Sequence, residues 1–258
     1  MFINILKYIY KYKIFKRLVP SLLRIIGGSR EISLYNFKLL LSLSNSIERE
    51  IFLTNYYDKD RFEYLDPFVN KYKFEFFFDI GSYIGYYSLY YCHHLEIKNI
   101  YSFEANKINF KKINKNILIN NSNIKSYNIA LSNYRGEGKI WFNDKNKTGG
   151  SSVYDSSDNE ITKYNFSEIT YENVNLDTLD SMFSYLRNKK ILIKIDVERH
   201  ELNVLEGSIN LLKKNQILMQ IEILNSKKKI VFDMLIKNNY HHHFSIDDDH
   251  FFSNFIKV

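Results

Sequence analysis

The sequence predicts an α/β fold: a doubly wound, mostly parallel sheet of seven strands, with an antiparallel C-terminal hairpin and an N-terminal helical extension. Two observations lead to this prediction. From about residue 72, short apolar runs alternate with segments of helical periodicity, which is typical of parallel sheets covered by helices. The 258 residues are 45% hydrophobic, enough for the core of one large domain. We therefore expect an extension over residues 1–70 and an α/β domain over residues 71–258.

The N-terminal 28 residues differ from the rest of the chain in charge. They hold six lysines and arginines, no aspartate or glutamate, and many bulky apolar side chains. We expect either a helical arm packed on the domain or an interfacial helix that makes peripheral contact with an anionic membrane. No run of eighteen uncharged apolar residues occurs, so no spanning helix is expected. The remainder of residues 1–70 looks helical and irregular, and Pro20 and Gly27-Gly28 break it.

The first half of the domain shows successive strand–helix units. Phe74–Ile80 is a nearly continuous apolar run, as expected for a strand covered on both faces. Residues 84–91 have bulky side chains at three- and four-residue spacing and predict a helix. A second strand is expected at residues 99–103, a helix at 106–120 and a third strand at 124–131.

Residues 133–175 interrupt this alternation. They are polar and rich in turn residues, and we expect an inserted hairpin and loop. The alternation then resumes with a strand, a helix, a strand and a helix, expected at residues 191–195, 202–212, 217–223 and 230–236. The tail, residues 240–258, is expected to form the antiparallel hairpin that closes one edge of the sheet.

Carboxylates gather at the predicted strand ends, where ligands bind in open α/β sheets. The five positions concerned are Asp79-x-Gly81, Glu104, Ala130-Leu131-Ser132, Asp196–His200 and Glu222. Four of the five include a carboxylate. We therefore expect the functional site at this edge of the sheet.

The turn Asp79–Gly85 is the first candidate for ligand binding. Gly81 and Gly85 allow a ligand to approach the backbone, but the GxGxxG pattern of dinucleotide-binding proteins is absent. Glu104 lies 25 residues after Asp79 and could accept two hydrogen bonds from a ribose diol. An ordinary strand-to-helix turn is the alternative interpretation. No GxxxxGK[ST] phosphate loop occurs.

The segment Lys194–Glu201 is the densest group of chemically active side chains. Because alternate residues of an extended chain face the same way, Asp196 and Glu198 could converge on one ligand. Together with His200 they could activate a substrate hydroxyl or hold a divalent cation. If a metal binds, its predicted ligands are Asp196, Glu198 and Glu222. The alternative is structural, with Lys194 and Asp196 as an ion pair and the glutamates at a helix N-terminus.

Two other features are expected to be structural. The tract His241–His243, with His250 and Asp247–Asp249, resembles a metal-binding segment, but we expect solvated surface on a terminal hairpin remote from the other strand ends. Cys92 is the lone cysteine, so no intramolecular disulfide can form. It lies in a predicted helix and is expected in the core. A single thiol is compatible with a reducing compartment, and we expect a cytoplasmic protein with membrane contact only at its periphery.

These motifs together resemble the FkbM-type methyltransferase family, a branch of the class I S-adenosylmethionine-dependent enzymes. The resemblance spans about residues 77–225 and rests on several segments in the order of the family. They are FDIGSYIGYYSL, YSFEAN followed by INKNILINN, IALSN, TGGSS, VNLDTLD, and LIKIDVERHELNVLEGS with QIEI. Two positions depart from the family: Ser82-Tyr83 replaces Ala-Asn, and Arg199 replaces a glycine.

The resemblance implies a Rossmann-like fold, S-adenosylmethionine as cofactor, and O-methylation of a hydroxyl on a small molecule, such as a sugar, glycan or secondary metabolite. The turn with Asp79, Gly81, Ser82 and Gly85 would shape the methionine end of the cofactor site. Glu104 would bind the ribose hydroxyls. Asn128 to Ala130 would flank the adenine, and Asp196 would lie at the reaction centre.

Our mechanistic hypothesis is that Asp196 orients the acceptor and that His200 or Glu198 removes its proton. Two alternatives stay open. The net charge of +7 favours anionic partners, but the Asn/Asp-Pro-Pro-Tyr motif of many amine-methylating enzymes is impossible, because the only prolines are Pro20 and Pro67. Nucleic acid is therefore disfavoured as a partner, although an RNA ribose methyltransferase is not excluded. The second alternative is a non-catalytic, membrane-associated protein that retains the fold.

Overall fold

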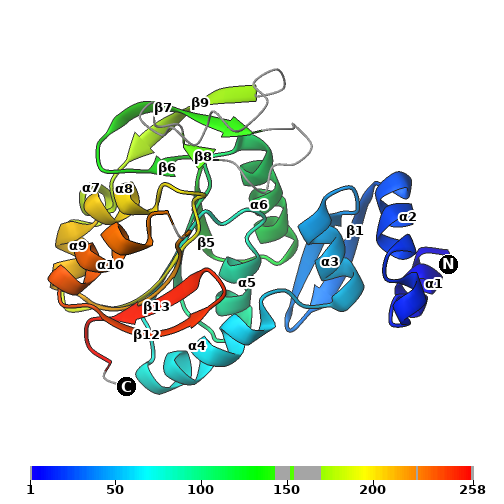
Figure 1. The fold of residues 1–258 in the computed structure, drawn as a ribbon, viewed down its shortest axis with the longest axis horizontal. Coiled ribbons are helices and arrows are strands. Elements are labelled where there is room, and N and C mark those ends of the chain that lie inside the picture. Colours follow the sequence, from blue (N-terminus) through cyan, green and yellow to red (C-terminus); the bar gives the residue numbers. More distant parts are fainter. Residues whose placement is uncertain (1, 143–151, 154–169, 225, 257–258) are drawn as a thin grey trace.

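The computed structural model describes residues 2–142, 152–153, 170–224 and 226–256, and at its centre lies a sheet of seven strands (Figure 1). The strands are β3 (Phe76–Ile80), β4 (Asn99–Phe103), β5 (Ile124–Tyr127), β10 (Lys190–Ile195), β11 (Gln216–Glu222), β12 (His241–Ile246) and β13 (Asp249–Ser253). Their order in space is β12-β13-β11-β10-β3-β4-β5. The five strands from β11 to β5 are parallel, and β13 pairs antiparallel with both β11 and β12. The predicted doubly wound sheet with a closing hairpin is confirmed.

Helices cover both faces of this sheet, which explains why its strands are apolar throughout. Neighbouring residues of a strand point to opposite faces, so Phe77 belongs to one core cluster and Phe78 to the other. The first cluster includes α4 (Lys59–Tyr72) and α5 (Tyr86–His93). The second includes α7 (Leu179–Met182), α8 (Glu201–Glu206), α9 (Ile209–Lys214) and α10 (Lys228–Lys237).

The single helix expected at residues 202–212 is divided into α8 and α9. The division falls at Gly207, where a Cβ would lie 1.9 Å from the carbonyl oxygen of Ser132. The chain therefore approaches another backbone so closely that only glycine can occupy the position. The prediction of one continuous helix was therefore wrong, and the division coincides with this close approach.

The N-terminal segment contains a hairpin that the sequence analysis missed. Its elements are α1 (Phe2–Ile9), η1 (Lys13–Phe15), α2 (Leu18–Ile26), β1 (Ser29–Leu34), β2 (Phe37–Ser42) and α3 (Ser46–Thr54). On the edge of β2 that does not pair with β1, backbone groups form hydrogen bonds with side chains of α6 (Lys107–Ile119) and of the residue that follows it. The amide of Asn120 bonds to both the N–H and the C=O of Lys38, at 2.7 Å each, and Asn116 accepts the N–H of Leu40. Amide side chains thus replace a neighbouring strand, a pairing that residue periodicity does not reveal.

The insertion forms a second, smaller sheet above the carboxyl ends of the central strands (Figure 1). Its strands, in the order β6-β9-β7-β8, are β6 (Ala130–Leu131), β9 (Thr170–Asp177), β7 (Gly136–Phe142) and β8 (Ser152–Val153). The expected hairpin is present as the antiparallel pairs of β7 with β8 and β9. The predicted loop, and most of the TGGSS segment, lie outside the described residues.

The single strand expected at residues 124–131 was also wrong. The chain leaves the central sheet after Tyr127, and Ala130 pairs with β9 instead. Asn128 causes this exit, because its amide donates to the carbonyl oxygens of Glu104 and Ala105, at 2.9 Å each.

None of the helices formed by the described residues combines the length and the apolar character that crossing a bilayer requires.

Candidate functional site

A cavity of about 140 Å³ opens at the carboxyl ends of β3, β4 and β10. The chain order of the sheet reverses between β3 and β10, because β4 and β5 lie on one side and β11 on the other. Open α/β sheets bind ligands at such a switch point.

Only glycine fits at position 81, which lines this cavity. Its φ is +80°, and a Cβ there would lie 1.7 Å from the carbonyl oxygen of Asp196. The ends of β3 and β10 therefore touch backbone to backbone. Gly81 and Ser82 line the cavity, and their N–H groups both donate to the carbonyl oxygen of Phe103. Gly85, with φ +80°, directly precedes α5 and does not line the cavity.

Asp79 presents an unused hydrogen-bond acceptor to the cavity. One carboxyl oxygen, Oδ2, accepts the N–H of Ser88 at 3.1 Å and its hydroxyl at 2.6 Å. The other, Oδ1, is buried and has no hydrogen-bond partner among the described residues. Burial raises the pKa of Asp79, although Lys194 and Ser88 oppose the shift. Buried polar atoms are normally satisfied, so this oxygen retains an unused hydrogen-bond acceptor.

Tyr83 connects the turn Asp79–Gly85 to the N-terminal segment. Its N–H donates to Glu104 at 2.9 Å, and its hydroxyl donates to the fully buried Glu48 of α3 at 2.7 Å. Lys112 pairs with the same carboxylate at 2.5 Å. The φ of Tyr83 is +51°, a conformation that asparagine tolerates better than tyrosine. Tyrosine, in place of the Asn that the family resemblance implies, therefore carries a conformational cost but gains a hydrogen bond to Glu48.

Glu104 lies at the end of β4 and lines the cavity, as predicted. Its two oxygens accept the N–H groups of Tyr83 and Asn106, the latter at 2.8 Å. Burial raises the pKa of Glu104 to about 7, against the effect of these bonds. Of the residues expected beside the adenine, Ala130 lines the cavity and Asn128 does not.

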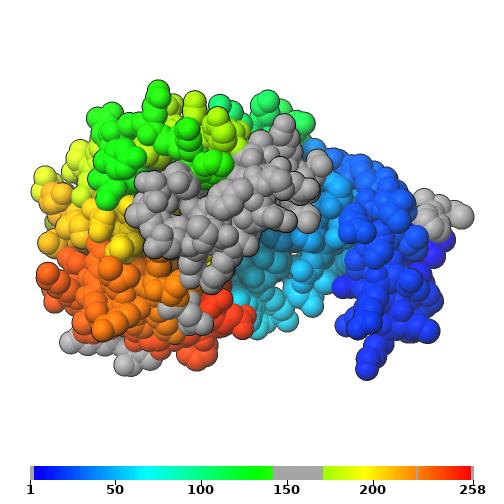
Figure 2. Space-filling model, turned by 45° about the horizontal axis from the view of Figure 1, so that its top comes forward, coloured from blue at the N-terminus to red at the C-terminus, as the bar shows by residue number. Residues whose placement is uncertain are grey.

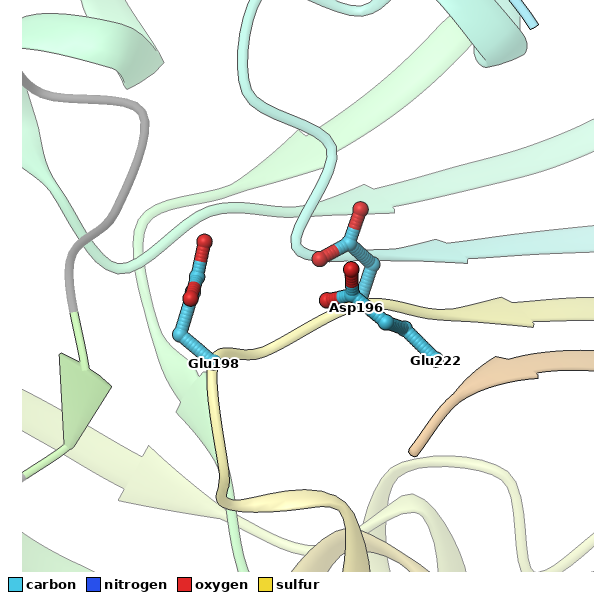
Figure 3. Close-up of side chains that lie close together, drawn as sticks. All are labelled: Asp196, Glu198 and Glu222. Atoms are coloured by element: carbon cyan, nitrogen blue, oxygen red, sulfur yellow. The ribbon is translucent and has the colours of Figure 1, made fainter. Parts of the chain in front are cut away.

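Three carboxylates meet where β10 and β11 end (Figure 3). Asp196, Glu198 and Glu222 each offer an oxygen within 4.8 Å of the others. In the described part of the chain, this is the group of side chains that could hold a metal ion. Burial, reinforced by Asp196, raises the pKa of Glu222 to about 9, and burial raises that of Glu198 to about 7.

Asp196 is held ionised by its neighbours. Burial alone would raise its pKa, but Lys194 and a hydrogen bond from Glu222 hold the pKa below its usual range. The ammonium of Lys194 lies 2.7 Å from the carboxylate. The ion pair expected as the structural alternative is therefore present, and Asp196 and Glu198 also line the cavity.

His200 is not brought to the cavity with these carboxylates. It is buried, and its Nε2 lies 3.0 Å from the hydroxyl of Ser132. Glu198 and Arg199 have φ of +53° and +83°, so two left-handed residues in succession turn the chain after β10. The rule of alternating sides, which placed His200 beside Asp196, applies only to extended backbone. The resemblance to the FkbM family implies glycine in place of Arg199, and glycine is the residue best suited to a positive φ.

The N-terminal segment supplies a wall of the cavity that the sequence analysis did not predict. Ile47 and Ile51 of α3, and Tyr57 and Asp58 after it, all line the cavity. Asp58 accepts the hydroxyl of Tyr87 at 2.9 Å, and burial raises its pKa to about 6. No spacing or motif connects these residues with β3 or β10, so a single sequence offers no signal for them.

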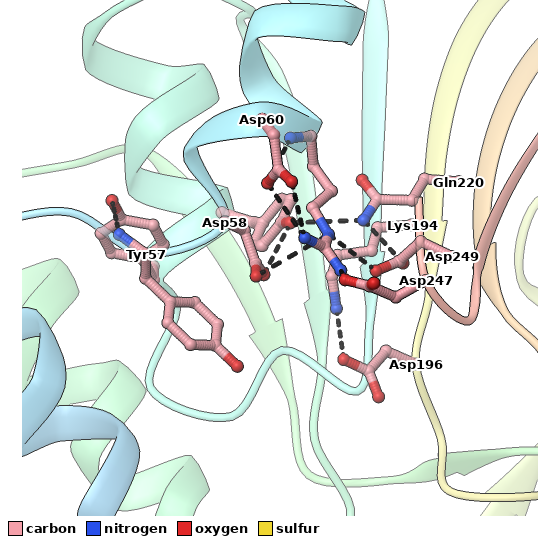
Figure 4. Close-up of polar contacts among 11 residues, drawn as sticks. Tyr57, Asp58, Asp60, Lys194, Asp196, Gln220, Asp247 and Asp249 are labelled. Carbon is pink, nitrogen blue, oxygen red and sulfur yellow. Dashed lines mark hydrogen bonds and ion pairs between the residues drawn. The ribbon is translucent and has the colours of Figure 1, made fainter. Parts of the chain in front are cut away.

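A polar network holds this wall against the sheet (Figure 4). Arg61, whose side chain is only 14% exposed, bonds to Asp247 at 2.8 Å and to Asp249 at 3.0 Å. Asp249 also accepts the amide of Gln220 at 2.8 Å, and that amide lies 3.3 Å from the hydroxyl of Tyr87. The C-terminal hairpin is thereby connected to Asp58 through Tyr87.

The hairpin is therefore not simply solvated surface. His241, His242 and Asp247 are exposed, as expected. That expectation was wrong for Asp249, which bonds to Arg61, and for His250, which is buried with Nδ1 at 2.6 Å from Ser245. The tract is also not remote from the other strand ends, because Asp249 pairs with Glu222 in the sheet. Cys92 is partly buried against the core, and burial raises its thiol pKa.

A family model described as the methyltransferase FkbM domain matches residues 79–247. The match begins at Asp79 and includes the turn Asp79–Gly85, Glu104, Asp196 and Glu222. A comparison with proteins of curated function finds no match.

Solved methyltransferase structures are among those similar to the chain. The FkbM methyltransferase of Methylobacillus flagellatus is 14% identical over 70% of this chain, with a TM-score of 0.44. This chain covers 43% of that protein, less than half its length. A human methyltransferase 10 domain containing protein is 11% identical over 92% of this chain and 93% of its own, with a TM-score of 0.46. The N-terminal domain of human METTL16, solved with SAH, is 12% identical over 75% of this chain and 67% of its own, with a TM-score of 0.40.

Proposed function

The chain belongs to the FkbM methyltransferase domain family, and from this premise we propose that it transfers a methyl group from S-adenosylmethionine to a hydroxyl of a sugar, glycan or secondary metabolite. One observation carries the proposal. Gly81, Glu104 and Asp196 come from three different strand ends, and all three line one cavity at the switch point of the sheet. This arrangement suits a nucleoside-containing ligand.

The residues of the turn suit each part of the cofactor. The unpartnered Oδ1 of Asp79 is an acceptor for the ammonium group at the methionine end. Glu104 retains acceptor capacity for ribose hydroxyls, because a carboxylate has about four lone pairs and only part of them is used. Ala130 and its neighbour Ile129 offer an apolar surface for the adenine ring.

Glu198 is better placed than His200 to remove the acceptor proton. It lines the cavity, and its raised pKa of about 7 lies near neutral pH, where a general base is most effective. His200 is bonded to Ser132 and lies outside the cavity lining. When bound, S-adenosylmethionine supplies an electrophilic methyl carbon. Asp196 would orient the acceptor oxygen toward that carbon, and Glu198 would take the hydroxyl proton.

The charges around the cavity favour an acceptor without phosphate. Asp58, Asp196 and Glu198 all face the cavity, and Lys194 is already paired with Asp196. A phosphate group beside these carboxylates would be repelled. We therefore prefer a neutral polyol acceptor to RNA ribose, whose 2′-hydroxyl is flanked by phosphates.

Cofactor binding is the first test, by calorimetric titration with S-adenosylmethionine. Wild type is expected to bind. Glu104→Gln is expected to weaken binding about tenfold or more, because charge-assisted hydrogen bonds to the ribose are lost. Glu137→Gln, which changes an exposed carboxylate of β7, is the matched control and should bind normally. Failure of wild type to bind would refute the proposal and favour a non-catalytic protein.

Methyl transfer is the second test, with a labelled methyl donor and a panel of sugars and glycans. Glu198→Gln should lower the rate about 10²–10⁴-fold while cofactor affinity is retained. His200→Asn should retain most of the rate. The opposite result, a loss with His200→Asn alone, would show that the assignment of the base is wrong. Chelator treatment, followed by added Mg²⁺, tests whether the three carboxylates also use a divalent cation.

A further inference from the structure

The N-terminal surface formed by α1, η1 and α2 is apolar and basic at once. Eight of the 18 large hydrophobic side chains that are exposed in the described part of the chain lie within residues 5–26. They are Ile5, Tyr8, Tyr12, Ile14, Leu18, Leu22, Ile25 and Ile26. Figure 2 shows this segment as a lobe that projects at one end of the molecule. We call it the N-terminal lobe.

Helix α2 is apolar on both of its faces. Val19 and Leu23 are fully buried and form its inner face. Leu18, Leu22 and Ile25 follow one another at helical spacing on its outer face, and they are 57%, 42% and 78% exposed. A helix on a protein surface normally presents polar residues to water, whereas the exposed side of α2 carries these three apolar side chains beside Ser21 and Arg24. The outer face of α2 therefore indicates a partner.

The charges of the N-terminal lobe identify the chemistry of that partner. Lys11, Lys13, Lys16, Arg17 and Arg24 are exposed, and the first acidic residue of the chain is Glu31. The ammonium of Lys11 lies over the ring of Tyr8, 3.9 Å from its centre. Basic side chains beside bulky aliphatic and aromatic ones are typical of helices that lie in the interface of an anionic bilayer.

We propose that the N-terminal lobe binds the surface of a membrane that contains anionic lipids. The outer face of α2 enters the boundary between headgroups and acyl chains, and the five exposed cations contact lipid phosphates. A second copy of the chain suits this surface poorly, because a two-fold contact would bring like charges together. RNA would use the cations but leave Leu18, Leu22 and Ile25 exposed to water.

Vesicle sedimentation of the full chain tests the proposal independently of methyl transfer. Vesicles of phosphatidylcholine with phosphatidylglycerol are compared with vesicles of phosphatidylcholine alone. We expect binding to the anionic vesicles that falls as salt rises from about 0.1 to about 0.5 M. Equal recovery in the supernatant with both vesicle types would overturn the proposal.

Two variants separate the apolar from the ionic contribution. The first replaces Leu18, Leu22 and Ile25 with Asn without a change of charge, and the second replaces the five exposed cations with Gln. Each is expected to weaken vesicle binding about tenfold or more. Matched controls change exposed residues elsewhere: Leu118→Asn with Ile236→Asn, and Gln at Lys98, Lys111, Lys115, Lys213 and Lys214. These controls should bind as wild type does.

Unchanged thermal unfolding of the variants shows that a loss of binding is not a loss of folding. Two results would overturn the proposal by showing that the N-terminal lobe binds a partner other than a membrane. One is a dimer in light scattering that the triple Asn variant abolishes while anionic vesicles do not bind. The other is salt-sensitive binding of single-stranded RNA with no binding to vesicles.

Discussion

Gly81→Ala is predicted to lower the stability of the fold substantially. The new Cβ would lie 1.7 Å from the carbonyl oxygen of Asp196, and real Cβ atoms essentially never approach closer than 3.0 Å. The obstacle is backbone, so no side-chain rotation can remove it. The ends of β3 and β10 would have to move apart by more than 1 Å.

The magnitude follows from what that movement breaks. A non-glycine residue in the left-handed region costs about 1–2 kcal/mol. The hydrogen bond from Asp196 N–H to Ile80 C=O, at 3.0 Å, and that from Gly81 N–H to Phe103 C=O, at 2.9 Å, would both be strained. Each contributes about 1 kcal/mol when buried. We therefore expect Gly81→Ala to lower the free energy of unfolding by about 3–4 kcal/mol, or the unfolding midpoint by about 10 °C.

Chemical denaturation of the purified protein measures this loss. Gly136→Ala is the matched control, because its φ is not left-handed and its added Cβ would meet only the ring of Tyr134, at 3.4 Å. The control should unfold within about 0.5 kcal/mol of wild type. If Gly81→Ala lost no more than the control did, the inferred backbone contact between β3 and β10 would be incorrect.

Three further predictions concern single side chains. Tyr83→Phe should lower the free energy of unfolding by about 1–2 kcal/mol in denaturation, because the buried Glu48 loses a donor; an unchanged value would contradict the 2.7 Å contact. The pKa of Glu222 is raised to about 9, so the folded state binds this proton more tightly than the unfolded chain, and stability should fall as pH rises from about 4.5 to 9. Glu222→Gln should flatten that decline in unfolding midpoints measured against pH, and an equally steep decline would show that the shift has another source. Arg199→Gly should leave the free energy of unfolding unchanged or raise it by up to about 1 kcal/mol. The relief of the positive φ offsets the greater conformational entropy of glycine in the unfolded chain. A clear decrease in the free energy of unfolding would show that Arg199 makes a contact that outweighs its backbone strain.

The sequence was sufficient to predict the sheet, because burial of a strand or helix constrains the pattern of apolar residues within that segment. A strand covered on both faces must be apolar at every position, and its helices must repeat at three- and four-residue spacing. The same logic predicted the edge of the sheet that holds the candidate site, since Asp79, Glu104 and Asp196 lie at or directly after the ends of apolar runs. It failed where contacts with distant residues overrode the local pattern. Asn128 diverts the chain after Tyr127, and the amide groups of α6 complete a hairpin in the N-terminal segment.

The composition of the cavity wall was decided only by tertiary structure. Asp58 reaches the site through contacts with Tyr87 and, by way of Gln220 and Asp249, with the C-terminal hairpin. These partners are separated by up to about 190 residues, so no periodicity relates them. His200, in contrast, was predicted at the site but lies outside the cavity lining, because two left-handed residues before it turn it away from Asp196. A sequence records which residues end a strand, but the direction in which a side chain points after that end depends on backbone angles and on packing against distant parts of the chain.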